Sequence, residues 1–385
     1  MKELLYRNSL LLLLIILVAG CSGGDSDSAT TAATFNLAIS IDGPGTGTVI
    51  SSPAGINCGT DCTESFTENT VVTLTTSSAS GSSFAGWSGA CSGTESCSVT
   101  MDAKKSVIAT FVEYSVDCSS YATYMPIAAP EIKLSAGATT TVIVMHGKAG
   151  SPLDGYLSPL YTELTNAGYD VISPYMPWSE LVWDGAMCEA MNYIDSLAAQ
   201  EAAKNMNVIV AGHSMGGAHA LIYAATAPAA EVKGIIAMAP GHFPHLELPL
   251  LAVLDPGTAA SIISSITSAE SMADSGLGDM DGTFDTLIPD LNSPLLTISA
   301  TANHYLSYHA LYQYPDINDV LPPIRLPVLW LAGDVDPLTT FYNMPALFNQ
   351  ITSQYSSYEL VTGDHLGMVS SSATPIDDWL FSLGL

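Results

Sequence analysis

One stretch of the sequence decides the fold: Val208-Ile209-Val210-Ala211-Gly212-His213-Ser214-Met215-Gly216-Gly217. Its first four residues are apolar and mostly β-branched, which is typical of a strand buried on both faces. The residues from Gly216 to about Ala227 are mostly small and apolar, which favours a helix. Glycines two residues before and after Ser214 allow the chain to turn very tightly. The stretch therefore predicts a strand, a sharp turn with a serine at its tip, and a helix.

Strands and helices alternate on both sides of this turn. Further buried-type strands are predicted at 141–145, 170–173, 234–238, 328–331 and 358–361. Helices are predicted from a Ser158 cap to Gly168, from Asp184 to Lys204 and from Ile376 to Leu383. This alternation predicts an α/β fold with a mostly parallel sheet covered by helices on both faces. The long irregular segment between the strands at 234–238 and 328–331 is expected to form a cap or lid over about 241–325.

A serine hydroxyl needs a base to become a nucleophile, and the base needs an acid to orient it. His365 lies in the loop Gly363-Asp364-His365 after the last predicted strand, and it is the only histidine beyond Asp336. It is therefore the candidate base. Asp336 in Gly333-Asp334-Val335-Asp336-Pro337 is the candidate acid, with Asp334 as the alternative.

The order Ser214, Asp336, His365 and the G-x-S-x-G turn resemble the α/β-hydrolase family over about 115–385. The resemblance implies an esterase- or lipase-like serine hydrolase with a small ester substrate and no cofactor. It also implies an oxyanion hole formed by the backbone N–H groups of Met215 and Lys148. The Lys148 side chain itself is expected to be solvated. The same residues would serve a peptidase or a thioesterase, and an adhesion or scaffold protein with an inactive hydrolase domain is the non-enzymatic alternative.

Two groups in the predicted lid have alternative roles. His242, His245 and Glu247 are candidate metal ligands, but the sequence offers no further well-spaced ligand, so a lid or surface role and no metal is expected. The second group could line a substrate pocket, although packing within the lid is the favoured interpretation. It comprises Tyr305, Tyr308, Tyr312 and Tyr314.

The N-terminus indicates export. Lys2 and Arg7 precede the apolar run Leu10–Ala19, which is shorter than the roughly 20 residues that span a bilayer. The run ends in Leu17-Val18-Ala19-Gly20-Cys21, which resembles the lipobox of bacterial lipoproteins. The resemblance implies a signal peptide over 1–20, an acylated Cys21 that anchors the chain in a bilayer, and the outer membrane of a Gram-negative bacterium. An ordinary leader with a chance cysteine is the alternative. Residues 21–34 are expected to be a flexible tether.

Residues 35–114 have a different pattern. Short alternating runs at 35–41, 71–74 and 107–111 predict a small all-β module. Segments such as Phe84-Ala85-Gly86-Trp87-Ser88-Gly89 and Gly45-Thr46-Gly47-Thr48-Val49 resemble the divergent internalin-type B-repeat of bacterial surface proteins. The resemblance implies a spacer or adhesion role. Trp87 is expected in the core of the module rather than at a ligand site.

The cysteines other than Cys21 form an even set: Cys58, Cys62, Cys91, Cys97, Cys118 and Cys188. In an exported chain such a set predicts disulfides, and six cysteines allow about 15 connectivities. Proximity favours the pairs Cys58–Cys62, Cys91–Cys97 and Cys118–Cys188, and a zinc site formed by the first four is the alternative.

Composition indicates a globular chain and excludes one class of partner. The 385 residues include 48% hydrophobic and 12% charged residues, which is typical of a globular chain. The formal net charge of −28 would repel phosphate backbones, so we expect no nucleic-acid partner. Nothing in the sequence predicts the oligomeric state.

Overall fold

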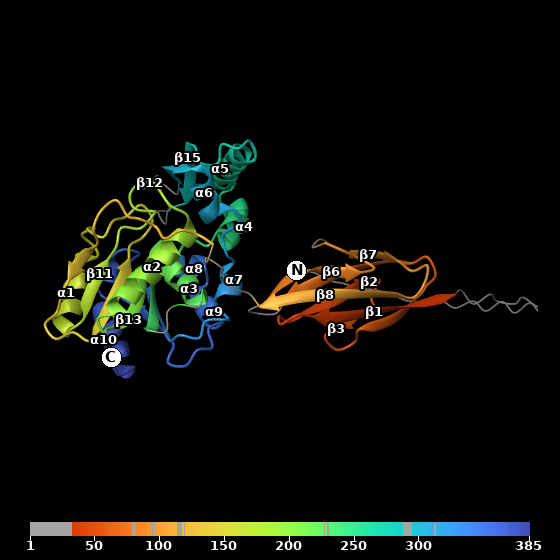
Figure 1. Cartoon of the computed structure of the whole chain (residues 1–385), viewed down its shortest axis with the longest axis horizontal. Helices are drawn as coiled ribbons and strands as arrows, with labels where there is room; N and C mark the ends of the chain where they lie inside the picture. The colour runs from red at the N-terminus through yellow and green to blue at the C-terminus, as the bar shows by residue number, and fades with distance from the viewer. Residues whose placement is uncertain are drawn as a thin grey trace, which may run out of the picture.

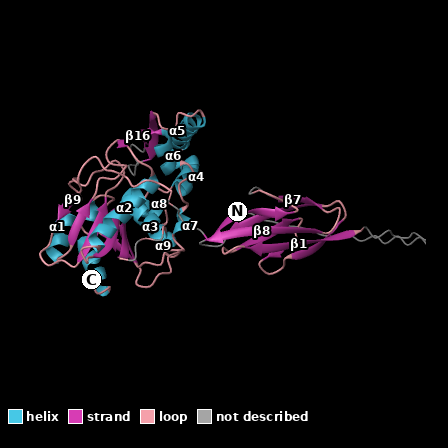
Figure 2. Cartoon of the chain, viewed as in Figure 1, coloured by secondary structure: helices cyan, strands magenta, loops and turns pink. Residues whose placement is uncertain are grey.

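The computed structural model describes residues 33–78, 82–93, 97–113, 118, 120–226, 228, 231–287, 295–311 and 313–385. Figure 1 and Figure 2 show an all-β body followed in the chain by a larger body of strands and helices. The predicted signal peptide, Cys21, most of the predicted tether and Tyr312 lie outside the described residues. None of the described helices is long and apolar enough to cross a membrane.

The all-β body consists of two four-stranded sheets, with the strand orders β4-β1-β8-β6 and β3-β2-β5-β7. The strands are β1 (Thr34–Asp42), β2 (Gly47–Ser52), β3 (Asn57–Cys58), β4 (Thr63–Thr67), β5 (Val71–Ser78), β6 (Ser82–Gly89), β7 (Cys97–Thr100) and β8 (Lys105–Glu113). Leu37, Val49 and Phe111 from both sheets are fully buried in one core. Trp87 is 6% exposed in the same core, which confirms its predicted packing role.

The second body is built on a seven-stranded sheet with the order β18-β17-β14-β13-β10-β11-β9. Its strands are β9 (Glu131–Lys133), β10 (Thr140–Met145), β11 (Asp170–Ser173), β13 (Asn207–His213), β14 (Val232–Met238), β17 (Val328–Gly333) and β18 (Ser357–Val361). Neighbouring strands are parallel except for β9 against β11. The strand order reverses at β10, and in such sheets ligands bind at the carboxyl ends of the strands near the reversal. The predicted α/β class is confirmed.

Helices cover both faces of this sheet (Figure 2). Along β10, Val142 and Val144 pack with α1 (Ser158–Ala167) and α10 (Ala373–Ser382), whereas Ile143 and Met145 pack with α2 (Met187–Ala202) and α3 (Met215–Ala225). All four side chains are fully buried. Burial of one such side chain stabilises the fold by about 1.5–3 kcal/mol. This two-sided burial explains why the strand reads as a continuous apolar run.

The segment predicted to form a lid, residues 241–325, lies between β14 and β17 and keeps the name lid below. Its described elements are α4 (Pro244–Leu254), α5 (Pro256–Asp274), β15 (Asp281–Leu287), β16 (Leu295–Thr301), α6 (Ala302–His309) and α7 (Ile317–Val320). The antiparallel pair β15–β16 is joined in parallel by β12 (Val182–Trp183) from the loop after β11. The strands were not predicted from the sequence, although buried Phe284 and Thr286 alternate with more exposed neighbours along β15. The lid is thus joined to the body by a sheet.

Two helices begin at other residues than the sequence predicts, α2 later and α1 one residue earlier. Helix α2 starts at Met187 rather than Asp184, because the Glu189 carboxylate accepts a hydrogen bond from the Ala186 N–H at 2.9 Å. Ser158 is the first residue of α1 rather than its cap. Gly168 ends α1 as predicted, with a φ of 108° that favours glycine.

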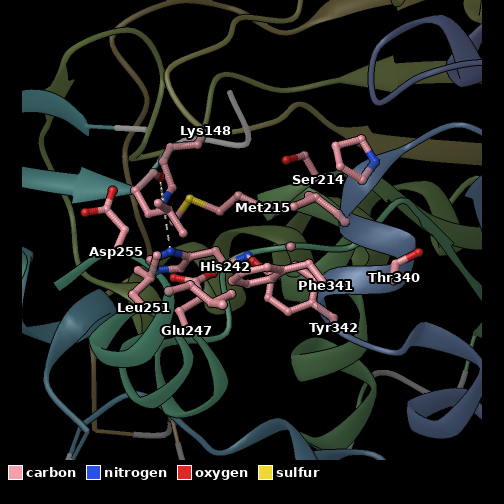
Figure 3. A pocket seen from close by; sticks show the side chains of 15 residues that line it. Lys148, Ser214, Met215, His242, Glu247, Leu251, Asp255, Thr340, Phe341 and Tyr342 are labelled. Carbon is pink, nitrogen blue, oxygen red and sulfur yellow. Dashed lines mark hydrogen bonds between the residues drawn. The ribbon is translucent and has the colours of Figure 1, made fainter. Parts of the chain in front are cut away.

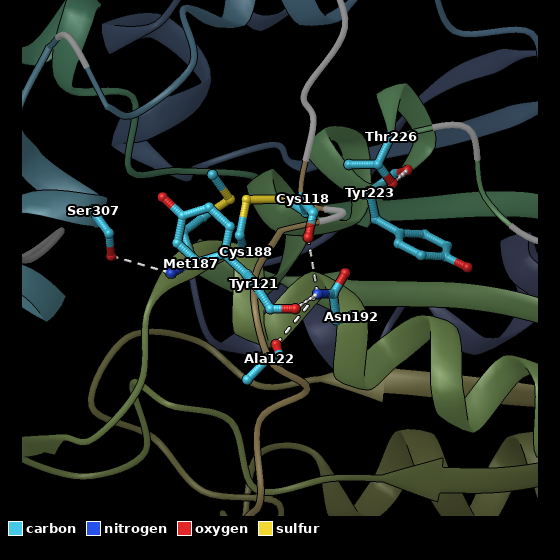
Figure 4. The surroundings of a disulfide bond; sticks show 9 residues. All are labelled: Cys118, Tyr121, Ala122, Met187, Cys188, Asn192, Tyr223, Thr226 and Ser307. Atoms are coloured by element: carbon cyan, nitrogen blue, oxygen red, sulfur yellow. Dashed lines mark hydrogen bonds between the residues drawn. A yellow bond between two sulfur atoms is a disulfide. The ribbon is translucent and has the colours of Figure 1, made fainter.

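The three cysteine pairs favoured by proximity are disulfides in the structure. The alternative zinc site is therefore wrong, because its four thiols are joined in pairs. Figure 4 shows that Cys118–Cys188 attaches the segment before the sheet to α2. Asn192 reinforces this attachment, since its side-chain amide donates to the carbonyls of Cys118, Tyr121 and Ala122.

Candidate active site

Ser214 lies at the tip of the turn between β13 and α3. Its φ of 55° and ψ of −120° are strained for a residue with a side chain. The turn is so tight that a Cβ on Gly212 would lie 2.1 Å from the carbonyl oxygen of Gly216. A Cβ on Gly216 would in turn lie 2.5 Å from the carbonyl oxygen of Met145. The predicted strand–turn–helix is confirmed, and the two glycines are required by close backbone contacts.

The structure brings the three predicted triad residues together. The Nε2 atom of His365 lies 2.9 Å from the Oγ of Ser214, and its Nδ1 atom lies 2.9 Å from an oxygen of Asp336. All three residues are buried, and they are 3–8% exposed. With a proton on Nδ1, the ring donates to the carboxylate and leaves Nε2 free to accept the serine proton.

The two candidate acids have different partners. The second oxygen of Asp336 accepts a hydrogen bond from the Leu338 N–H at 2.9 Å, at the start of α8 (Pro337–Phe341). Asp334 is exposed, and its carboxylate accepts from the Gly363 N–H instead. Asp334 thus shapes the loop that carries His365 but does not contact the imidazole.

His213, next to the serine, supports the same loop. Its Nε2 lies 2.7 Å from the backbone carbonyl of His365, and the two rings are 4.8 Å apart. Burial first, and then His365 nearby, keep the pKa of His213 well below its usual range. His213 is therefore neutral, and its Nε2–H donates to the carbonyl. The sequence pattern gave no sign of this support, because His213 and His365 are 152 residues apart.

The loop after β10 passes directly beside Ser214. A Cβ on Gly147 would lie 3.2 Å from the Cβ of Ser214. Met215 is the first residue of α3, where backbone N–H groups have no partner within the helix. The chain segments that carry the predicted oxyanion donors, Met215 and Lys148, therefore adjoin the serine. Their function as donors stays a prediction.

Comparison with known proteins agrees with this architecture. Residues 186–364 match the family model described as serine aminopeptidase, S33, and residues 46–115 match the divergent InlB B-repeat domain. The sheet order, the serine turn and the Ser–Asp–His order occur together within one body. The larger body is an α/β-hydrolase domain. The first body is a divergent B-repeat domain.

Three solved structures illustrate what the chain is similar to. The monoacylglycerol lipase of Paleococcus ferrophilus is 18% identical, with a TM-score of 0.44 over 66% of this chain and 100% of that chain. Est1E from Butyrivibrio proteoclasticus is 15% identical, with a TM-score of 0.45 over 66% of this chain and 92% of that chain. A monoglyceride lipase of Saccharomyces cerevisiae is 17% identical, with a TM-score of 0.45 over 70% and 98%. A search of curated proteins gave no match.

Lys148 connects this loop of the α/β-hydrolase domain to the lid. Its ammonium group lies 2.9 Å from Nδ1 of His242, 3.0 Å from Oγ1 of Thr286 and 2.6 Å from the carbonyl of Leu287. Figure 3 shows Lys148 and His242 joined in this way. Burial lowers the pKa of Lys148 to about 8, although the nearby charge of Glu247 acts in the opposite direction. The expected solvated side chain is therefore wrong.

The tautomers in this network are consistent with three donated protons. Nε2 of His242 lies 2.9 Å from the carbonyl of Tyr308, so Nε2 carries the proton and Nδ1 accepts from Lys148. His309 has Nδ1 3.0 Å from the carbonyl of Tyr305 and Nε2 2.8 Å from Oγ1 of Thr286. The Thr286 hydroxyl therefore donates to His309 and accepts from Lys148. Burial lowers the pKa of His309 to about 3 and that of His242 well below its usual range, so both are neutral.

A cavity of about 430 Å³ opens beside Ser214 and extends under the lid. Its apolar walls include Leu251, Leu254, Leu287, Leu338 and Phe341. Its polar groups come from Lys148, His242, Glu247, Asp255 and Tyr342. Tyr342 was not predicted as a site residue, because it lies 95 residues beyond Glu247, to which it hydrogen-bonds.

The candidate metal ligands and the tyrosines of the lid are buried in the structure. His242 and Glu247 are each 4% exposed, so they lie in the lid but are not at its surface. Among the described residues no three histidine, cysteine or acidic side chains converge as metal ligands. Tyr305, Tyr308 and Tyr314 are 0–2% exposed and do not line the cavity, which confirms their packing role.

Proposed function

We propose that the protein is a serine hydrolase that cleaves carboxylic esters through an acyl-enzyme intermediate. The observation that carries this proposal is the chain of two 2.9 Å contacts from Ser214 through His365 to Asp336, at the tip of a strained turn. His365 takes the hydroxyl proton of Ser214 as the oxygen attacks the ester carbonyl. Asp336 holds the proton-bearing Nδ1 and stabilises the imidazolium that forms.

The oxyanion of the tetrahedral intermediate is assigned to the backbone N–H groups of Met215 and Lys148. His365 then gives its proton to the leaving alcohol, and a water molecule repeats the sequence on the acyl-enzyme. The apolar walls of the cavity support an ester with an apolar part, since apolar lining with a few polar groups is typical of small-molecule sites.

Aminopeptidase activity is the second candidate. It is favoured by the family description that matches residues 186–364, and the same three residues serve acyl transfer to water from amides. Comparing kcat/KM for p-nitrophenyl esters and aminoacyl p-nitroanilides distinguishes the two. We expect hydrolysis of the esters with acyl chains of increasing length and little hydrolysis of the anilides.

The decisive variant is Ser214→Ala. It should lose nearly all ester hydrolysis and all labelling by a fluorophosphonate probe, with unchanged thermal unfolding. Wild-type turnover in this variant would contradict the serine mechanism. Labelling of the wild-type protein would also exclude the alternative of a scaffold protein with an inactive hydrolase domain.

For the N-terminal part we propose a lipid anchor at Cys21 and a spacer formed by the B-repeat domain. The lipobox-like Leu17-Val18-Ala19-Gly20-Cys21 supports this anchor. We place it in the outer membrane of the cell envelope. The anchor would leave the α/β-hydrolase domain held near a membrane by a tether and the B-repeat domain.

A further inference from the structure

The cavity beside Ser214 contains a buried carboxylate with one oxygen unbonded. Glu247 lies in the first turn of α4 and is 4% exposed. Its Oε1 accepts hydrogen bonds from the Phe243 N–H at 2.8 Å and from the Tyr342 hydroxyl at 2.6 Å. Its Oε2 accepts none from the residues that the structure describes. This oxygen is open to the cavity rather than sealed in the protein, so a ligand there that donates a hydrogen bond would be favoured.

The neighbouring protein groups cannot supply that donor. All three protons of the Lys148 ammonium are directed to His242, Thr286 and Leu287. His242 has its one ring proton on Nε2, which points to the carbonyl of Tyr308. No ion pair within 4.0 Å joins Lys148 and Glu247 in the described part of the chain. Glu247 is one of the residues that line the cavity (Figure 3), so its free oxygen is available to a ligand there.

The tyrosine partner fixes the direction of donation. Burial first, and then the Glu247 charge, raise the pKa of Tyr342 well above its usual range, so its hydroxyl keeps its proton. That proton goes to Oε1, while the same hydroxyl oxygen accepts from the backbone N–H of His242 at 3.4 Å. Glu247 is thus held rigidly by one oxygen and presents the other.

We propose that this cavity selects esters that carry a hydroxyl group, which donates a hydrogen bond to Oε2 of Glu247. The inference rests on the proposed ester hydrolysis at Ser214. A hydroxyl fits better than an ammonium group, because the Lys148 ammonium lines the same cavity and would repel a second cation. The leucines and Phe341 around it would contact the aliphatic part of the substrate.

The test compares matched esters that differ only at their far end. One series has p-nitrophenyl esters of straight-chain acids ending in hydroxyl, methyl, methoxy or ammonium. A second series has butyrate esters of alcohols with the same four ends, so that the two series identify the half of the substrate that enters the cavity. In one series we expect kcat/KM for the hydroxyl ester to exceed that of its methyl partner by about tenfold or more.

Glu247→Gln supplies the matched variant. An amide can keep an oxygen toward Phe243 and Tyr342 and present its NH₂ group to the cavity, so the preference should move from hydroxyl toward methoxy. Glu163→Gln is the control, because this carboxylate is exposed on α1 and is not among the residues that line the cavity. The ratio of hydroxyl to methyl ester in this control should match the wild-type ratio.

Three outcomes would overturn the inference. They are equal kcat/KM for hydroxyl and methyl esters in both series, a preference for the ammonium ester over the hydroxyl ester, and a wild-type ratio that persists in Glu247→Gln. The wild-type series decides the matter even if the variant does not fold. Failure of the proposed function looks different, because then the methyl ester would be hydrolysed equally by Ser214→Ala or not at all.

Discussion

The ammonium group of Lys148 makes stability depend on pH. Burial lowers its pKa from 10.5 to about 8 in the folded protein, although the Glu247 charge opposes the shift. In the unfolded chain the pKa returns to 10.5. Between these two values the unfolded state binds more protons, so the contribution of Lys148 to the free energy of unfolding increases as pH rises. Lys148→Met should abolish this increase, because methionine fills similar space without a titratable group.

The magnitude follows from the two pKa values. A full proton of difference changes the free energy of unfolding by about 1.4 kcal/mol per pH unit. Between pH 8.0 and 9.5 the Lys148 contribution should therefore rise by about 1.5 kcal/mol. Buried tyrosines act in the opposite sense near pH 10 and above, because burial raises the pKa of Tyr342 and Tyr305 and their unfolded forms lose protons first. The window therefore ends at pH 9.5.

Urea unfolding of the wild type and Lys148→Met at pH 8.0 and 9.5 measures the effect. We expect the difference in unfolding free energy between the two proteins to change by about 1.5 kcal/mol in favour of the wild type. The loss of three hydrogen bonds adds an offset that does not vary with pH. Lys104→Met in the B-repeat domain is the control, since Lys104 is exposed and should leave the pH dependence unchanged. Parallel pH profiles for the wild type and Lys148→Met would refute the reasoning.

Three further predictions concern the triad, the spacer and the anchor. Asp336→Asn should lower kcat by about 10³–10⁴ because the amide favours the wrong imidazole tautomer, whereas Asp334→Asn should change it only a few-fold; a larger loss in Asp334→Asn would reverse the assignment. Deletion of residues 35–113 should keep turnover of a small soluble ester within a few-fold of the wild type. A large loss of turnover in a folded truncation would show that the B-repeat domain forms part of the active site. Cys21→Ser should release the protein from membranes or retain its leader, so unchanged fractionation and mobility would exclude the anchor.

The sequence by itself determined the features that depend on neighbouring residues. The β-branched run before Gly212 and the small residues after it specify the turn at Ser214. The strand pattern, the helix pattern and the glycine spacing all lie within one short stretch of the chain. The strands at 170–173 and 141–145 were predicted to within a residue, since burial on both faces leaves an unbroken apolar run. The disulfide Cys58–Cys62 followed from proximity in the chain. The order of Ser214, Asp336 and His365 could also be predicted, because each residue follows a strand that the apolar pattern identifies.

Only the tertiary structure decided which side chains meet across the sheet and the lid. The sequence favoured Asp336 but left Asp334 open, and the loop geometry directs Asp336 to His365 and Asp334 to Gly363. Lys148 and Thr286 are 138 residues apart, and no periodicity links them. Their contact depends on the strand β12, which joins the lid hairpin to the body. Glu247 shows the same limit: its buried, half-bonded carboxylate arises from Tyr342, 95 residues away, because cavities form between elements that the sequence pattern describes one at a time.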